Sequence, residues 1–301
     1  MPGKNIMSTG SALFRGIGVY GRMIKFSHSV FALPFALSAV VLAAGSHRIE
    51  MAAVFWIIMA MVTARSAAMG FNRIVDAPFD KENPRTKRWE LPAGQISLRS
   101  AVGFVLASSV LFIFAAFMLG GLCGALAVPA LAVLFGYSYT KRFTRWCHLY
   151  LGGVISMAPM GAWIAVTNTF SWGIFALCLA LMTYIAGFDM IYACMDIEFD
   201  RARCLFSVPA ISGVRPALWF SAGLHLASLG FLAFLYLFFD MGWIYLTAVF
   251  AIAVLYAIEH LLVKPDDMRA IHVAFFHVNS VISVVLFVGI AMDKIISGRL
   301  I

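Results

Sequence analysis

The chain contains apolar runs that are too long and too closely spaced for the core of a soluble domain. Residues 26–45, 51–70 and 101–119 each approach the roughly 20 residues that a helix needs to cross the hydrocarbon of a bilayer. Only 12% of the 301 residues are charged, about half the usual share in a soluble domain. Because lipid offers no water to backbone groups, such runs are predicted to be helices. The chain is therefore predicted to be an integral, multi-pass membrane protein.

The predicted fold class is all-α: a single domain over residues 1–301, built as a bundle of about nine membrane helices. The candidate helices cover residues 26–45, 51–71, 97–119, 121–140, 148–167, 171–195, 214–238, 241–262 and 270–291. Short connections alternate with longer, basic ones, so the two kinds of connection are expected to lie on opposite sides of the membrane.

Basic residues predict the orientation of the bundle. With the N-terminus inside, all but three of the 22 lysines and arginines lie on the inner side, the exceptions being Arg48, Lys294 and Arg299. The positive-inside rule then places the N-terminus and the long loops in the cytosol and the C-terminus outside. We expect the inner membrane of a bacterium. The formal charge of +8 is mostly a topology signal, and its spread over several loops does not favour nucleic-acid binding.

Two acidic segments repeat with an offset of 120 residues. They read Asp76-Ala-Pro-Phe-Asp80-Lys and Asp196-Ile-Glu-Phe-Asp200-Arg. Each follows an even-numbered candidate span, the second and the sixth. We therefore predict a four-helix unit that is used twice, with its acidic motifs at residues 72–80 and 189–200.

The spacing of these residues predicts a metal site. Asp76 and Asp80 are four residues apart, as are Asp196 and Asp200, so each pair projects from one helix face. Asn72 extends the first face and Asp189, seven residues before Asp196, extends the second. So many carboxylates need a cation between them, and hard oxygen ligands suit Mg²⁺ with phosphate oxygens. We expect the two clusters to hold one diphosphate through Mg²⁺.

The alternative is a solvated acidic surface, which is the usual reading of a single acidic pair at a helix end. Two copies at matched positions, each extended by a third polar residue, favour a functional site. Pro78 lies between Asp76 and Asp80, so the helix is expected to be kinked or to restart there.

These motifs resemble those of the UbiA superfamily of intramembrane prenyltransferases. The family pattern Asn-x-x-x-Asp-x-x-x-Asp is met by Asn72, Asp76 and Asp80. The second pattern, Asp-x-x-x-Asp, is met by Asp196 and Asp200, with Asp189 and Tyr192 upstream. Three further stretches are similar to the 4-hydroxybenzoate polyprenyltransferase branch: Lys25-Phe-Ser-His28-Ser-Val-Phe-Ala-Leu-Pro34-Phe, Leu91-Pro-Ala-Gly94 and Tyr137-Ser-Tyr-Thr-Lys141-Arg142-Phe-Thr144.

The resemblance implies an enzyme of quinone biosynthesis with a central cavity that opens to the cytosolic side. It would transfer a polyprenyl group from a polyprenyl diphosphate to a small aromatic acid, using Mg²⁺ as cofactor and no obligate protein partner. The implied acceptor is 4-hydroxybenzoate or, alternatively, the 1,4-dihydroxy-6-naphthoate of menaquinone synthesis. A relative acting on a haem or chlorophyll-type ring is a further alternative. From another class, a divalent-cation or proton-coupled transporter would also carry intramembrane carboxylates.

The resemblance also implies roles for single residues. Asp76, Asp80, Asp196 and Asp200 would ligate Mg²⁺, with Asn72 beside them. Phosphate contacts are expected from Arg85, Lys87, Arg88 and Arg201. Lys141 and Arg142 would hold the carboxylate of the acceptor, and Asp189 or Tyr192 would orient the phenol or accept its proton. Arg65, which shares a helix face with Asn72, is expected to line the cavity and orient an aspartate.

The chain departs from the family pattern at two places. Trp89 stands where a second arginine is expected, and Ser207 keeps a hydroxyl where a Lys-Ser or Lys-Thr pair is usual. His28 is predicted to be a packing or interfacial residue. Polar packing is also the prediction for a group near the C-terminus: Glu259, His260, His272, His277 and Asn279.

Overall fold

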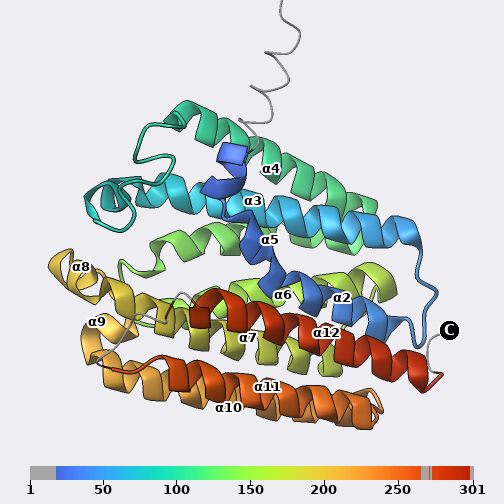
Figure 1. Ribbon diagram of the computed structural model, residues 1–301. Helices are drawn as coiled ribbons and strands as arrows, with labels where there is room; N and C mark the ends of the chain where they lie inside the picture. The colour runs from blue at the N-terminus through green and yellow to red at the C-terminus, as the bar shows by residue number, and fades with distance from the viewer. Residues whose placement is uncertain (1–17, 266–270, 272, 299–301) are drawn as a thin grey trace, which may run out of the picture.

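The computed structural model describes residues 18–265, 271 and 273–298, and they form a bundle of roughly parallel helices (Figure 1). Within these residues nine helical segments are long and apolar enough to cross a membrane, as the sequence predicts. The helices are α2 (Leu33–Ala43), α3 (Met51–Glu82), α4 (Leu98–Met118), α5 (Gly121–Thr140), α6 (Cys147–Thr167), α7 (Trp172–Ala193), α8 (Ile197–Ala202), α9 (Val208–Ser212), α10 (Val214–Phe238), α11 (Trp243–Leu262) and α12 (Asn279–Ile296). Three tighter or wider segments complete them: the 3₁₀ helices η1 (Phe26–Phe31) and η2 (Cys194–Asp196) and the π-helix η3 (Val273–Val278). His272 lies outside the described residues.

Helix α3 corrects one predicted boundary. The span was predicted to end at residue 71, but α3 continues through Pro78 to Glu82. Polar side chains support this continuation of the helix, because Asn72 Nδ2 donates to Asp76 Oδ2 at 2.8 Å, one turn away. Pro78 removes a single backbone hydrogen bond, and the helix tolerates that loss near its end. Asp76 and Asp80 therefore lie on one continuous helix.

Three other predicted spans are divided, and the ninth consists of η3 followed by α12. The first consists of η1 followed by α2, and the chain enters it through Lys25, whose φ of 48° is left-handed. The sixth ends as α7 at Ala193 and continues through η2 into α8. Asp196 closes η2 and Asp200 lies within α8. The second acidic pair is thus divided between a tightened 3₁₀ turn, which holds Asp196, and the short α-helix α8, which holds Asp200.

One end of the bundle collects the polar segments. The connection of residues 83–97 and helices α8 and α9 lie together at the left of Figure 1, and we call this the polar end. The α2–α3 connection and the α10–α11 turn lie at the other end. There Asp293 of α12 accepts from the backbone N–H groups of Gly242 and Tyr245, at 2.8 and 3.2 Å, and fixes the start of α11.

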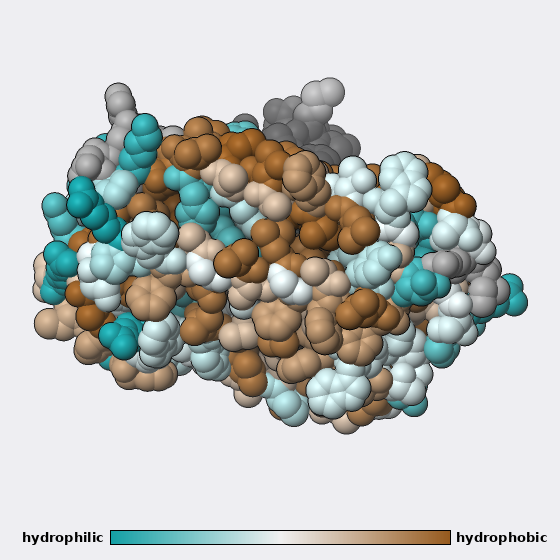
Figure 2. All heavy atoms as spheres, turned by 90° about the horizontal axis from the view of Figure 1, so that it is seen from below, coloured by the Kyte–Doolittle hydropathy of each residue, from teal (hydrophilic) through white to brown (hydrophobic). Residues whose placement is uncertain are grey.

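Helix α7 is the centre of the bundle, since most of its residues are buried and it packs against both α6 and α10. The outer helices present apolar side chains instead. Figure 2 shows a mainly hydrophobic face with hydrophilic residues gathered toward its ends. Trp219, Phe250 and Leu261 of α10 and α11 are among the most exposed large side chains. Such a belt matches a surface that lies in lipid.

The α6–α7 contact depends on Gly152. A Cβ atom built on Gly152 would overlap the carbonyl oxygen of Met182 in α7, which is backbone and cannot swing away. On neighbouring Gly153, no described atom lies within 4 Å of the Cβ position. Small residues allow membrane helices to approach this closely.

We predict that Gly152→Ala lowers stability by about 1–3 kcal/mol, because it forces α6 and α7 apart. Gly153→Ala is the matched control and is expected to melt within about 1 °C of the wild type. Thermal unfolding of the detergent-solubilised variants measures both. Equal melting temperatures for the two variants would contradict the close approach seen here.

Candidate functional site

A polar cavity of about 240 Å³ lies at the polar end of the bundle. It is bounded by η1, α3, the 83–97 connection, the end of α5, and the α7–α8 region. Both acidic pairs face it, Asp76 and Asp80 from one side and Asp196 and Asp200 from the other. Segments about 120 residues apart in sequence therefore meet around one space.

Asp196 is held by the 83–97 connection. Arg85 grips both carboxylate oxygens, with Nε at 2.9 Å from Oδ1 and Nη2 at 2.5 Å from Oδ2. Asn83 Nδ2 adds a hydrogen bond of 3.2 Å to Oδ1. The third nitrogen of Arg85, Nη1, donates to the hydroxyl of Tyr192 at 3.1 Å. A bidentate pair of this kind fixes geometry as well as charge.

The other three carboxylates also face a cation. Lys141 Nζ lies 3.3 Å from Asp200 Oδ2, which also accepts from the hydroxyl of Ser207 at 3.2 Å. Arg142 Nη2 lies 3.6 Å from Asp76 Oδ1. Arg73 Nη1 lies 3.6 Å from Asp80 Oδ2. The four predicted metal ligands are thus balanced by four basic side chains.

Arg73 is a site residue that the sequence analysis missed. It is buried on α3, and its guanidinium carbon lies 3.9 Å from the ring centroid of Trp89. Lys25 Nζ lies over the same ring at 4.6 Å. Trp89 stands where the family pattern has an arginine. It therefore does not add a positive charge to the site, but its ring makes cation–π contacts with two basic side chains. The spacing could have indicated it, because Arg73 is seven residues before Asp80, just as Arg65 is seven residues before Asn72.

Several predicted residues lie elsewhere. Lys87, Arg88 and Arg201 are exposed and do not line the cavity, and Arg201 Nε donates to the carbonyl of Ala210 at 2.6 Å. Lys87 and Arg88 lie in the 83–97 connection, and Arg201 lies in α8. Arg65 lines the cavity, but Nη2 donates to the backbone carbonyl of Lys25 at 3.3 Å rather than to an aspartate.

Asp189 and Tyr192 both line the cavity from α7. Asp189 Oδ2 lies 2.7 Å from Nδ1 of His148, a fully buried side chain of α6. No spacing in the sequence relates His148 to Asp189, since they come from different helices. The imidazole orients the carboxylate toward the cavity and gives it a partner for a proton.

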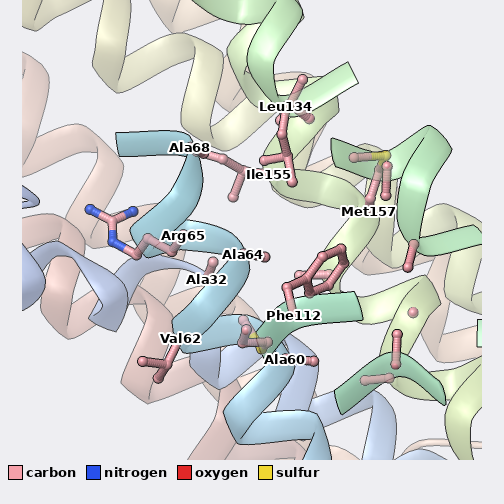
Figure 3. Close-up of a pocket in the computed structure, with 18 of the residues that line it drawn as sticks. Ala32, Ala60, Val62, Ala64, Arg65, Ala68, Phe112, Leu134, Ile155 and Met157 are labelled. Atoms are coloured by element: carbon pink, nitrogen blue, oxygen red, sulfur yellow. The ribbon is translucent and has the colours of Figure 1, made fainter. Parts of the chain in front are cut away.

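A second, apolar cavity of about 260 Å³ runs between α3, α4, α5 and α6. Figure 3 shows Phe112, Leu134, Ile155 and Met157 around it, with the guanidinium of Arg65 directed away from Phe112. The polar and apolar cavities share a small set of lining residues: Arg65, Met69, Asn72, Tyr137, Leu151 and Ile155. The two cavities therefore lie next to each other, one lined by charged side chains and the other, which we call the apolar branch, lined mainly by apolar ones.

The carboxylate oxygens of the site suit a hard divalent cation, but they can complete its coordination only together with oxygen atoms from a bound substrate or from water. No group of three His, Cys, Asp or Glu residues in the described ranges is close enough to hold a metal ion by itself. Mg²⁺ usually takes one or two carboxylates and completes its octahedron with phosphate oxygens and water. Two carboxylate pairs across a cavity, in which Asp80, Asp196 and Asp200 are buried and Asp76 is partly exposed, meet that requirement.

Burial and neighbouring charges shift the pKa values of three basic side chains at the edge of the polar cavity. Burial, together with the nearby Arg73 and Arg85, lowers the pKa of Lys25 from 10.5 to about 7. Burial opposes the charge on Arg85, but the hydrogen bonds and charge of Asp196 outweigh it and raise the pKa of Arg85. In the same way Asp200 overcomes burial and raises the pKa of Lys141. Lys25 is thus the cation whose charge changes near neutral pH.

We predict a pH-dependent stability that originates in Lys25. Its pKa is lower in the folded chain, so between pH 7 and 10.5 the unfolded chain binds more protons and folding becomes more favourable as pH rises. Lys25→Met should therefore be most stabilising, relative to the wild type, at about pH 6 and lose that advantage by about pH 10. Thermal unfolding of both proteins across this range tests it. A constant difference between them would exclude the effect.

Comparison with known proteins places this site in a family. A sequence profile of the UbiA prenyltransferase family matches residues 32–281. A polyprenyl transferase of Arthrobotrys oligospora is 32% identical over 59% of this chain, which spans half the length of that relative. A 4-hydroxybenzoate octaprenyltransferase of Saccharophagus degradans is 26% identical over 80% of each chain.

Solved structures share the fold. The apo structure of a UbiA homologue from Aeropyrum pernix K1 superposes with a TM-score of 0.80 at 28% identity, covering 89% of this chain and 98% of its own. A UbiA homologue from Archaeoglobus fulgidus, bound to DMAPP and Mg²⁺, has a TM-score of 0.69 at 16% identity, with 91% and 99% covered. The fold, the paired acidic motifs and the family match agree: this chain belongs to the UbiA prenyltransferase family.

Proposed function

We propose that this protein transfers a polyprenyl group from an allylic polyprenyl diphosphate to the ring of 4-hydroxybenzoate. The observation that carries the proposal is the pair of neighbouring cavities, in which paired carboxylates and cations lie next to an apolar branch. A diphosphate with an isoprenoid tail has the same two parts. Relatives named 4-hydroxybenzoate octaprenyltransferase support the acceptor.

Mg²⁺ is the proposed cofactor. Asp76, Asp80, Asp196 and Asp200 would hold it, with Asn72 beside them, and when bound it neutralises charge on the departing diphosphate. Mg²⁺ bound with DMAPP in a homologue of this fold supports the choice.

The basic residues would then change partners. Arg73, Arg85, Lys141 and Arg142 are already within reach of the carboxylates, so they are placed to pair with substrate anions once these carboxylates take a metal. These anions are the phosphate oxygens of the donor and the carboxylate of the acceptor, the latter being the role expected for Lys141 and Arg142. These basic side chains, which the fold already places around the cavity, would then stabilise the diphosphate leaving group. Lys87, Arg88 and Arg201 are farther out and would serve at most to attract the anion from solution.

The proposed transfer breaks one C–O bond and one C–H bond and forms one C–C bond. The allylic C–O bond breaks and its electron pair leaves with the diphosphate. A ring carbon ortho to the phenol forms the new C–C bond, and that carbon then loses its proton. Asp189, oriented by His148, is the base proposed for the phenol or ring proton, and Tyr192 is proposed to orient the phenol.

The competing functions are less well supported. A transporter site usually lies near the midplane on broken helices, whereas these carboxylates lie at the polar end and the chain belongs to a prenyltransferase family. Among acceptors, 1,4-dihydroxy-6-naphthoate stays the alternative, since it is also a carboxylated phenol.

The finer placement in the cell is also part of the proposal. The basic loops support a polar end that faces the cytosol, in the inner membrane of a bacterium. A four-helix unit used twice is supported by the acidic motifs, which end α3 and follow α7 at the same end of the bundle.

An activity assay tests the proposed function. Purified protein with geranyl diphosphate, Mg²⁺ and 4-hydroxybenzoate or dihydroxynaphthoate is expected to yield a prenylated arene and free diphosphate. Asp200→Asn should reduce kcat/KM by at least about 100-fold, because a metal ligand is lost. Exposed Glu198, two residues away in α8, gives the matched control Glu198→Gln, which is expected to stay within about two-fold. No product with either phenolic acceptor would refute the enzyme assignment.

The apolar branch should set donor length. Gly161 lines it, and no described atom lies within 4 Å of the Cβ position there, so Gly161→Leu adds bulk without a backbone clash. We expect this variant to keep activity with geranyl diphosphate and to lose at least about ten-fold with a donor of eight isoprene units. Gly153→Leu, outside the branch, is the control. Equal losses with short and long donors would show that the tail lies elsewhere.

A further inference from the structure

Polar residues of α10, α11 and α12 form a network that the proposed chemistry does not use. Glu259, Asn279 and His225 are fully or almost fully buried in the bundle, where polar side chains are expensive. Asn279 Nδ2 lies 2.9 Å from Glu259 Oε1, so it donates to the carboxylate across the α11–α12 contact. Such residues are rarely retained in a membrane interior without a role.

Asn279 also holds the π-helix η3. The same Nδ2 lies 3.0 Å from the carbonyl oxygen of Ala274 and 3.2 Å from that of Phe275. A π-helical turn widens the backbone and weakens its own hydrogen bonding, and such turns are frequent at functional sites. The hydroxyl of Tyr184 in α7 donates to the carbonyl of Asn279 at 2.8 Å. The wide turn is thereby fixed to α7 and α11.

The π-helix delivers Phe275 to the polar cavity. Its ring centroid lies 4.2 Å from that of Tyr192 and 5.2 Å from that of Phe188. Phe31 and His28 of η1 complete an aromatic wall, at 5.7 and 5.4 Å from Phe275. All five residues line the cavity, and none of them lines the apolar branch. The wall and the branch are distinct parts of the space.

Cations border this wall. The guanidinium carbon of Arg85 lies 5.3 Å from the Tyr192 ring centroid, and Lys25 Nζ lies 5.8 Å from it. A flat ring that carries an anionic group matches such a surface, because its face packs on aromatic rings while its carboxylate approaches the cations. An isoprenoid tail has neither feature.

We propose that the ring of the aromatic acceptor lies against Phe275 and Tyr192, and that Asn279 and Glu259 are positioning residues that hold Phe275 there through η3. This inference rests on the proposed prenyl transfer. The buried network then affects binding of the acceptor without touching it, because it fixes the position of Phe275. Binding of the donor depends instead on the carboxylates and the apolar branch.

Steady-state kinetics with separate variation of acceptor and donor test the inference. Phe275→Ala removes the wall without touching the network, and we expect the acceptor KM to rise about ten-fold, which corresponds to about 1.4 kcal/mol. Asn279→Asp keeps the shape but loses the donor to both carbonyls, and it should raise the acceptor KM in the same direction. The donor KM should stay within about two-fold in both variants.

Two controls separate positioning from general destabilisation. Glu259→Gln keeps an oxygen that can accept from Asn279, so its acceptor KM should remain near that of the wild type, whereas Glu259→Leu should resemble Asn279→Asp. Ser221→Ala removes another buried hydrogen bond, to the carbonyl of Gly187 at 2.8 Å, and should lower stability without changing the acceptor KM.

The double variant Phe275→Ala/Asn279→Asp is decisive. If Asn279 acts through Phe275, the double variant should bind the acceptor no more weakly than Phe275→Ala alone. Additive losses, or donor and acceptor KM values that rise together, would overturn the inference while leaving the proposed function intact. Absence of any prenylated phenol from the wild type would refute the proposed function itself, and the inference with it. If Asn279→Asp does not fold, Phe275→Ala decides by itself, since an unchanged acceptor KM there excludes the wall.

Discussion

Compensation of buried charge is the constraint on which the polar end of this protein depends. Four aspartates converge where the bundle limits access to water, and each needs a cation nearby to remain ionised. Three of the four cation partners come from a different element than the carboxylate they face. The ion pairs therefore hold α3, the 83–97 connection, the end of α5 and α8 in one arrangement. Removing any single partner would leave an uncompensated charge and loosen more than one contact.

The same balance explains how a site can be formed before its ligands arrive. The cations neutralise the carboxylates in the protein alone, and the complex of metal and diphosphate that we propose as ligand would carry both signs of charge. Metal and anion can then exchange partners with the protein groups, so that no buried charge is left alone at any stage. Arg85 shows this most clearly, since it grips Asp196 with two nitrogens and Tyr192 with the third. Metal alone or diphosphate alone would satisfy only half of these groups.

The sequence predicted the membrane helices and the acidic motifs because both are periodic, local signals. Hydropathy is read over about 20 residues, and Asp76 and Asp80 are one helical turn apart. The sequence did not predict contacts between residues that come from distant segments of the chain. His148 meets Asp189 only through the packing of α6 on α7, and Phe275 reaches Tyr192 only through a π-helix that hydropathy cannot distinguish from an α-helix. The end of α3 was also predicted wrongly, because the helix continues beyond the apolar run that defines the span.

The length of α3 has a consequence for where the reaction takes place. Its 32 residues span about 48 Å at 1.5 Å per residue, well beyond the roughly 30 Å of hydrocarbon in a bilayer. Even when tilted by about 20°, the helix must carry Asp76 and Asp80 to the depth of the lipid headgroups. An isoprenoid diphosphate floats at that same level, with its charge in the interface and its chain among the lipid tails. Such a molecule would move sideways into the protein without leaving the membrane, so the free energy of extracting a long hydrocarbon chain into water never arises.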